Sequence, residues 1–143
     1  MFGGPVGITD GPNPFYLHPE DLTGKNLHLY TLMPAHMIDL FDIGELQTSE
    51  LAPPFDFTKG APMLRMKLDP KNTQVGQDGD TLEDCETLYN IETDPKQETP
   101  IDEPDVENRF ALEIARYFAE HDAPSELFKH FDVVQPNVAI AGD

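Results

Sequence analysis

The amino-acid sequence predicts an α+β fold: a small, mostly antiparallel β-sheet of about four strands, covered by a C-terminal amphipathic helix, with long irregular loops. Three observations predict this fold class. Short segments alternate apolar and polar residues, as strands with one buried face do. One longer segment, residues 104–121, carries an apolar stripe at helical spacing. Fourteen prolines among 143 residues limit the length of the other regular elements.

The first part of the chain is predicted to supply three strands and a short helix. Residues 6–9 and 15–18 flank an Asp-Gly pair, a pattern typical of a β-hairpin. Residues 27–32 are β-prone and predict a third strand. Residues 34–41 begin with a proline and repeat apolar residues at i, i+3 and i+4, which predicts a short helix.

The middle of the chain is predicted to contain an irregular segment and one more strand. Residues 47–62 include three prolines and a glycine, so we expect a packed, extended loop there. The next six residues alternate cleanly, which predicts a half-buried strand over 63–68. Its buried face would carry Leu64, Met66 and Leu68.

Acidic residues are concentrated in one stretch. Residues 69–107 hold 13 acidic residues against two lysines and so contribute −11 of the net charge. Because such a block repels itself and stays in water, we expect a long exposed loop over 69–86. An apolar cluster predicts a strand over 87–92, and residues 93–103 form a connection to the final helices.

The C-terminal part of the chain is predicted to be helical and then loosely held. Pro104 fits the first position of a helix over 104–121, and acidic residues gather at its positive end. A second short helix is expected from Ser125 to Phe131. Residues 1–131 then form one domain, and residues 132–143 form a loosely ordered tail. The apolar stripe of the long helix comprises Val106, Phe110, Ile114, Tyr117 and Phe118.

Charge and hydropathy exclude several classes of partner. The chain carries 27 acidic and 9 basic residues, a formal net charge of −18, so bulk attraction to a nucleic-acid backbone is excluded. No apolar run approaches the length of a membrane-spanning helix, and we expect no membrane partner. The first residues lack a secretion signal, which favours a cytoplasmic location.

The residues alone predict no active site and no metal site. Cys85 lies among carboxylates, which suppress the reactive thiolate. The five histidines lack the spacing of a zinc motif, although His36 lies at a predicted strand-to-helix turn beside a proline. Asp78 and Asp80 begin like a Ca²⁺-binding loop, but Leu82 occupies the third ligand position. A solvated acidic loop is therefore favoured over a weak cation site.

Four separated segments of the chain follow one another in the same order as similar segments of a known protein family. Residues 2–11, 30–37 and 51–60 precede Leu88-Tyr89-Asn90-Ile91-Glu92-Thr93-Asp94-Pro95, and a helix then begins at Pro104. This arrangement resembles the C-terminal region of bacterial sulfatases, arylsulfatase-like members of the alkaline-phosphatase-like superfamily. The family's strand there reads Leu-Tyr-Asp-Leu-Glu-x-Asp-Pro, so the Asn and Ile are departures. The resemblance covers about residues 2–131.

The resemblance implies that the chemistry belongs to a different part of a larger enzyme. In this family a larger N-terminal domain carries the Cys-or-Ser-x-Pro-x-Arg motif, whose Cys or Ser becomes formylglycine, and the ligands of a divalent cation (calcium). None of these motifs occurs in the sequence, so no catalytic or metal residue transfers to it. The resemblance thus implies that this chain alone is no enzyme and holds no cofactor.

Two hypotheses from different classes follow. The resemblance implies a C-terminal subdomain of a sulfuric ester hydrolase that packs on the catalytic domain and borders its substrate pocket. The expected border residues are His36 and Lys59, with Tyr16 and His18 behind them. The expected partner is the sulfatase catalytic domain, or a second copy through the exposed sheet or helix surface. The alternative is an independent acidic interaction or weak cation-binding module with a sulfatase-derived fold.

Overall fold

The computed structural model describes residues 4–19, 26–33, 35–36, 39–68 and 88–136. The predicted loop over 69–86, with Cys85 and the calcium-like aspartates, lies outside the described residues, as does most of the predicted tail.

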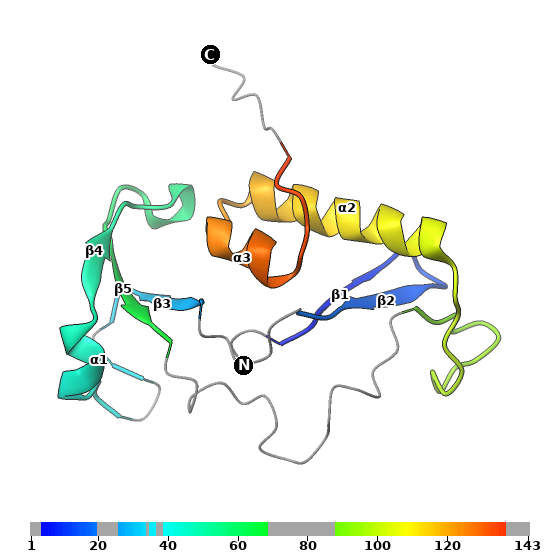
Figure 1. Ribbon diagram of the computed structural model, residues 1–143, viewed down its shortest axis with the longest axis horizontal. Helices are drawn as coiled ribbons and strands as arrows, with labels where there is room; N and C mark the ends of the chain where they lie inside the picture. Colours follow the sequence, from blue (N-terminus) through cyan, green and yellow to red (C-terminus); the bar gives the residue numbers. More distant parts are fainter. Residues whose placement is uncertain (1–3, 20–25, 34, 37–38, 69–87, 137–143) are drawn as a thin grey trace.

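The fold is α+β, and its strands are antiparallel, as the sequence predicts. The described strands form two sheets, a hairpin and a three-stranded sheet of order β3-β5-β4, at opposite ends of the view in Figure 1. They are thus divided between two small sheets where one sheet was expected. The elements are β1 (Val6–Thr9), β2 (Pro14–Leu17), β3 (His28–Thr31), α1 (Ile43–Gln47), β4 (Glu50–Ala52), the 3₁₀ helix η1 (Asp56–Thr58), β5 (Met63–Lys67), α2 (Pro104–Glu120) and α3 (Ser125–His130).

The β1-β2 hairpin confirms the prediction made from the Asp-Gly pair. Val6 pairs with Leu17 at the open end, and the strands close at a turn that starts with Asp10. The Asp10 carboxylate accepts a hydrogen bond from the Asn13 backbone at 3.2 Å, a common way to close a turn. Gly11 has φ of 112°, a conformation that favours glycine.

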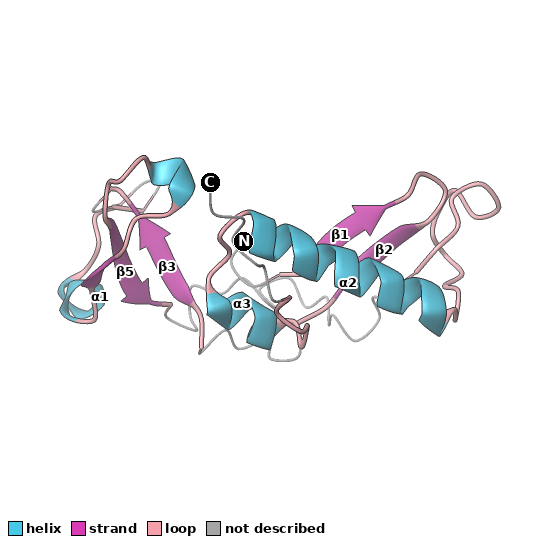
Figure 2. Ribbon diagram, turned by 90° about the horizontal axis from the view of Figure 1, so that it is seen from above, coloured by secondary structure: helices cyan, strands magenta, loops and turns pink. Residues whose placement is uncertain are grey.

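Helix α2 lies along the hairpin and builds the main core with it (Figure 2). Phe110 of α2 stacks on Phe15 of β2 with ring centroids 5.7 Å apart. Leu88 and Ile114 complete the buried cluster. The stripe predicted for this helix is correct except at Tyr117, which is 47% exposed because it lies at the margin of the apolar face.

The segment that starts at Leu88, part of the strand predicted over 87–92, runs beside β2 but pairs with it only briefly. Leu88 forms an isolated antiparallel bridge with β2. The backbone N–H groups of Tyr89 and Ile91 donate to the carbonyl oxygens of Pro14 and Pro12, at 3.0 and 2.8 Å. Because the two prolines have no N–H to donate in return, a regular ladder does not extend along this edge.

The second sheet confirms the strands predicted over 27–32 and 63–68. Met66 and Leu68 are buried and Lys67 is exposed, as the alternation predicts. At the start of the strand the alternation is weaker, because Met63 is buried and Leu64 and Arg65 are both half-buried. Strand β4 lies inside the segment predicted to be irregular. It contains only three residues before two prolines, which is too short for an alternation pattern to be visible.

The helix predicted over 34–41 is wrong in its described part. Ala35 and Leu40 form an antiparallel bridge, and the His36 N–H donates to the carbonyl oxygen of Asp39 at 2.8 Å. These contacts make a tight turn. The apolar residues whose spacing predicted a helix do not share one face, because Phe41 is buried while Leu40 points to solvent.

The helix of this region is α1, which begins at Ile43, two residues after the end of the predicted helix. The Asp42 carboxylate accepts the Glu45 backbone N–H at 2.8 Å, and the Glu45 carboxylate accepts the Asp42 N–H at 2.9 Å. This reciprocal capping box satisfies backbone donors at the start of the helix.

Helix α3 confirms the second short helix predicted near the C-terminus. Its Phe128 and the following Phe131 are buried, and both rings contact Phe118 of α2 at centroid distances of 5.7 Å. These aromatic contacts fix α3 against the end of α2. Within the described part of the chain, no helix is long and apolar enough to cross a membrane.

Candidate functional site

Tyr16 and His18 lie two residues apart on and just after β2, on the side opposite the buried Phe15. The Tyr16 hydroxyl donates to the Gln97 side-chain oxygen at 3.2 Å. Its ring meets Tyr89 edge to face, with centroids 6.4 Å apart. Tyr16 therefore packs on the connection that follows Leu88.

His18 is half-buried and has an unusual environment. Among the described residues, neither of its ring nitrogens has a hydrogen-bond partner, although both atoms are buried. Burial lowers the pKa of His18 below its ordinary value of 6.5, because desolvation penalises the charged ring. The neutral imidazole is the form that the fold favours.

His36 and Lys59 belong to the half of the chain that holds the three-stranded sheet. The Nε2 atom of His36 lies 2.8 Å from a carboxylate oxygen of Glu45, and its ring meets Phe41 edge to face. His36 therefore supports the start of α1. Lys59 is exposed and ends η1 with φ of 52°, in the left-handed region.

The four predicted border residues do not form one site among the described residues. Tyr16 and His18 lie with the hairpin, whereas His36 and Lys59 lie with the other sheet, and no described contact joins any two of them. Sequence spacing alone could not place them because the two sheets pair independently.

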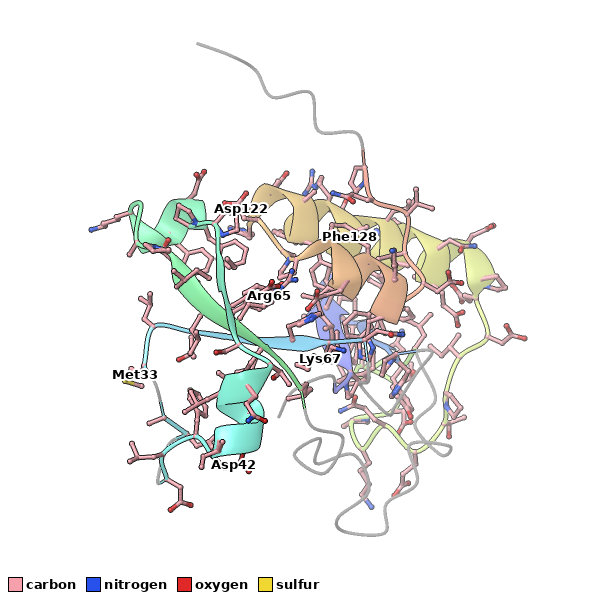
Figure 3. All side chains as sticks on the ribbon, turned by 60° about the vertical axis from the view of Figure 1, so that its left-hand side comes forward. Met33, Asp42, Arg65, Lys67, Asp122 and Phe128 are labelled. Carbon is pink, nitrogen blue, oxygen red and sulfur yellow. The ribbon has the colours of Figure 1, made fainter. Side chains whose placement is uncertain are left out.

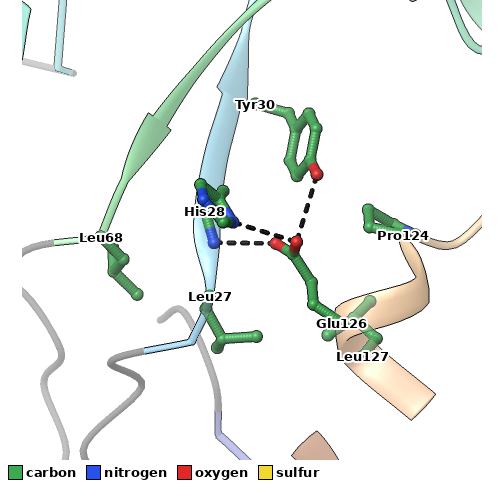
Figure 4. A pocket seen from close by; sticks show the side chains of 7 residues that line it. All are labelled: Leu27, His28, Tyr30, Leu68, Pro124, Glu126 and Leu127. Carbon is green, nitrogen blue, oxygen red and sulfur yellow. Dashed lines mark hydrogen bonds and ion pairs between the residues drawn. The ribbon is translucent and has the colours of Figure 1, made fainter. Parts of the chain in front are cut away.

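A pocket that the sequence did not predict lies between the three-stranded sheet and α3 (Figure 4). Its volume is about 240 Å³. The walls come from the start of β3 and the end of β5 on one side, and from Pro124 and the first turn of α3 on the other. The lining residues are Leu27, His28, Tyr30, Leu68, Pro124, Glu126 and Leu127.

Glu126 is the polar centre of this pocket. One carboxylate oxygen accepts the backbone N–H of His28 at 2.8 Å, and the other lies 3.0 Å from Nδ1 of the same histidine. The second oxygen also accepts the Tyr30 hydroxyl at 3.4 Å. The Glu126 side chain is only 17% exposed, so these contacts lie in a partly dry environment.

A polar row continues from the pocket across the sheet. Tyr30, Arg65 and Glu50 are direct neighbours on β3, β5 and β4, and the Arg65 guanidinium pairs with the Glu50 carboxylate. Burial, and then the charge of Glu126, raise the pKa of Tyr30 because both disfavour the phenolate. Tyr30 therefore stays a neutral hydrogen-bond donor at neutral pH.

A second contact joins the same two parts of the molecule. The Asp56 backbone N–H donates to the carboxylate of Asp122, in the turn between α2 and α3, at 3.0 Å. Figure 3 shows Asp122 beside the end of the sheet that carries η1. The acidic side chains of Asp122 and Glu126 thus connect the helical part of the chain with the three-stranded sheet.

The described lining residues of the pocket have the chemistry of a binding site: four aliphatic side chains surround one carboxylate, one imidazole and one phenol. No group of three or more potential metal ligands occurs in the part of the chain that the structure describes. Glu126 is held by fixed donors, which suits it to orienting or attracting a ligand.

Exposed apolar side chains gather in the same half of the chain as the three-stranded sheet. We call this set the apolar surface; it comprises seven of the eleven exposed large hydrophobic residues in the described ranges, and it is spread along the sheet, with η1 and α1 at opposite ends in Figure 1. They are Leu32, Met33, Leu40, Ile43, Leu46, Leu51 and Phe57. Met33 and the neighbouring α1 lie away from Phe128 of α3 in Figure 3, so α3 does not cover them.

Charge is low in this half. Residues 26–68 carry five acidic and three basic residues, a net charge of −2, while the rest of the chain carries −16. Apolar area with little charge is typical of contact surfaces between proteins.

No protein-family model matches the chain, and no curated protein and no solved structure matches it. The resemblance to bacterial sulfatases therefore remains a prediction from the sequence.

Proposed function

We propose that this chain is the C-terminal subdomain of a sulfatase-like sulfuric ester hydrolase. In this proposal it packs on a catalytic domain that is not contained in the 143 residues, and it has no catalytic centre of its own. The cation and the formylglycine would belong to that domain. The sulfatase-like order of four sequence segments suggests the family, and the apolar surface supports a docking role.

The apolar surface is costly to leave in water. Leu40, Ile43 and Leu51 are 79, 76 and 75% exposed. Covering each such side chain contributes about 1.5–3 kcal/mol relative to leaving it in water. The low net charge of residues 26–68 means that a partner can approach here against less repulsion than elsewhere on a chain of −18.

Helix α1 supports the same interpretation. It is properly capped by Asp42, yet none of its five residues is buried. Short helices gain most of their stability from packing an apolar face, and here Ile43 and Leu46 are exposed. A partner that covers α1 would supply the missing contact.

The predicted border residues divide into two groups under this proposal. His36 and Lys59 lie in the same stretch of chain as the apolar surface, so docking there would bring them to the rim of the partner's substrate pocket. Tyr16 and His18 belong to the hairpin and keep a structural role. The cytoplasm remains the proposed compartment.

Complementation tests the proposal. The chain is mixed with a sulfatase catalytic domain that lacks its own C-terminal region, and hydrolysis of an aryl sulfate is measured. We expect activity to rise on mixing, because docking completes the pocket. Ile43→Asp places a charge in the apolar surface and should reduce the rise at least tenfold. Leu112→Asp, at a site on α2 that is 65% exposed against 76% for Ile43, should not.

No gain in activity with any bacterial sulfatase domain would contradict the proposal. The alternative, an independent acidic interaction or cation-binding module, predicts a folded monomer whose melting temperature rises with millimolar Ca²⁺. A concentration-dependent dimer that Ile43→Asp disrupts would assign the apolar surface to a second copy of the chain.

A further inference from the structure

We propose that the pocket between β3 and α3 binds a small organic ammonium ion, with its apolar body among the leucines and its charged group on Glu126. This inference does not depend on the proposed docking role, because it concerns a different surface.

The walls of the pocket set the size and the apolar character of the ligand. Leu27, Leu68, Pro124 and Leu127 provide aliphatic contact on the sides that Figure 4 shows. The volume of about 240 Å³ is below the range of about 300–1,000 Å³ that is usual for drug-sized ligands. A single ring or a short alkyl chain with one polar end fits this size.

Glu126 sets the charge of the ligand. An ionised carboxylate offers about four acceptor positions. The second oxygen contacts both the His28 ring and the Tyr30 hydroxyl, whereas the first oxygen accepts a single bond from the His28 backbone. Among the described residues, one acceptor position on the first oxygen therefore remains without a partner, and neither lysine nor arginine lines the pocket. An ammonium N–H would pair with the carboxylate at that position.

Two further features favour a cation. The ring of Tyr30 lies beside Glu126 in the lining, and a phenol ring attracts an ammonium group near its face. The net charge of −18 raises the local concentration of cations and lowers that of anions around the whole chain. An anionic ligand would meet repulsion from both sources.

An organic cation suits the pocket better than a metal ion does. A calcium ion takes six to eight oxygen ligands and magnesium takes six. Among the described lining residues Glu126 is the one carboxylate, and a single open acceptor position on it is too few for either metal ion. The aliphatic walls would leave a hydrated metal ion without partners, whereas they bury the body of an organic ammonium.

Paired probes of one shape test the charge requirement. Benzylammonium and benzyl alcohol are titrated into the unmodified chain at neutral pH, and backbone amide shifts are followed by NMR. We expect benzylammonium to bind at least tenfold more tightly and to shift the amides of His28, Glu126 and Leu127. Equal affinity of the two probes, or shifts confined to other residues, would overturn the inference.

Glu126→Gln tests the role of the carboxylate. The amide oxygen can still accept the His28 N–H, so the variant removes the charge with little change of shape. We expect the tenfold preference for the ammonium probe to disappear, whereas Glu113→Gln, a change on the surface of α2, should preserve it. Retention of the preference in a folded Glu126→Gln chain would also refute the inference.

A second variant covers the case in which Glu126→Gln does not fold. Leu127→Phe keeps the carboxylate but narrows the pocket, so it should weaken both probes at least tenfold. If it leaves both affinities unchanged, the pocket is not the binding site. Failure of these tests would leave the complementation experiment unaffected, because none of its variants touches the pocket.

Discussion

At the scale of single residues, the burial of His18 predicts how the stability of the fold depends on pH. Its pKa is lowered by burial in the folded chain but stays at its ordinary value, about 6.5, in the unfolded chain. The unfolded state therefore binds more protons as the pH falls through 6.5. His18 thus stabilises the fold fully above that pH and destabilises it progressively below.

The ring protons of His18 in a pH titration by NMR measure this shift directly. We expect a midpoint below 6.5 and a smaller loss of stability between pH 7 and 5.5 in a His18→Gln chain. A midpoint at or above 6.5 would contradict the burial that the structure assigns to both ring nitrogens.

Single residues also mark where sequence reasoning stops. The contact between Glu126 and His28 joins positions 98 residues apart, and neither residue lies in a sequence motif that would predict it. The contact of His36 with Glu45 spans only nine residues, yet it depends on a turn that was predicted to be a helix. Side-chain partners follow from the tertiary pairing of elements, which local patterns do not encode.

At the scale of elements, the two faces of α2 provide a matched comparison. Phe110 is buried against Phe15, whereas Leu112, two positions later, is 65% exposed. Phe110→Ala should lower the free energy of unfolding by about 3–5 kcal/mol, because it leaves a cavity in the core. Leu112→Ala should change it by less than about 0.5 kcal/mol.

Urea unfolding of the two variants measures both values. Equal losses would mean that α2 does not pack on the hairpin through the predicted stripe.

The helices show which local signals are reliable. The α2 prediction succeeds because a long apolar stripe, a first-turn proline and acidic residues all agree. The prediction over 34–41 relied on three apolar residues and a first-turn proline, without acidic residues at its start. The Asp42-to-Glu45 spacing of a capping box stood just beyond it and marks the true start of α1.

At the scale of the whole molecule, the net charge of −18 predicts the response to salt. Like charges repel in the compact state, and raising the ionic strength from about 0.01 to 1 M shortens the screening length from about 30 to 3 Å. We therefore expect the melting temperature to rise with sodium chloride and then level off. A steady fall would show that attractive ion pairs, such as that of Arg109 with Asp10, outweigh the repulsion.

The division into two sheets is the main feature of the whole molecule that the sequence does not predict. Each strand except β4 was expected from the local sequence: β1 and β2 from the Asp-Gly pair, β3 from its β-prone residues and β5 from alternation. The pairing is antiparallel throughout. Membership of one sheet or another depends on which distant strands meet. Strand β5 joins β3 and β4, which follow the hairpin, so the hairpin is left to pack on α2.

Strand β4 affects how copies of this chain associate at high concentration. It lies at the edge of its sheet, where unpaired backbone groups can template fibrils. Its three residues run directly into Pro53 and Pro54, which have no N–H to offer an incoming strand. Apolar leucine side chains can thus remain exposed next to a sheet edge that resists growth into amyloid-like fibrils. Contacts formed there should be reversible and should depend on side-chain fit.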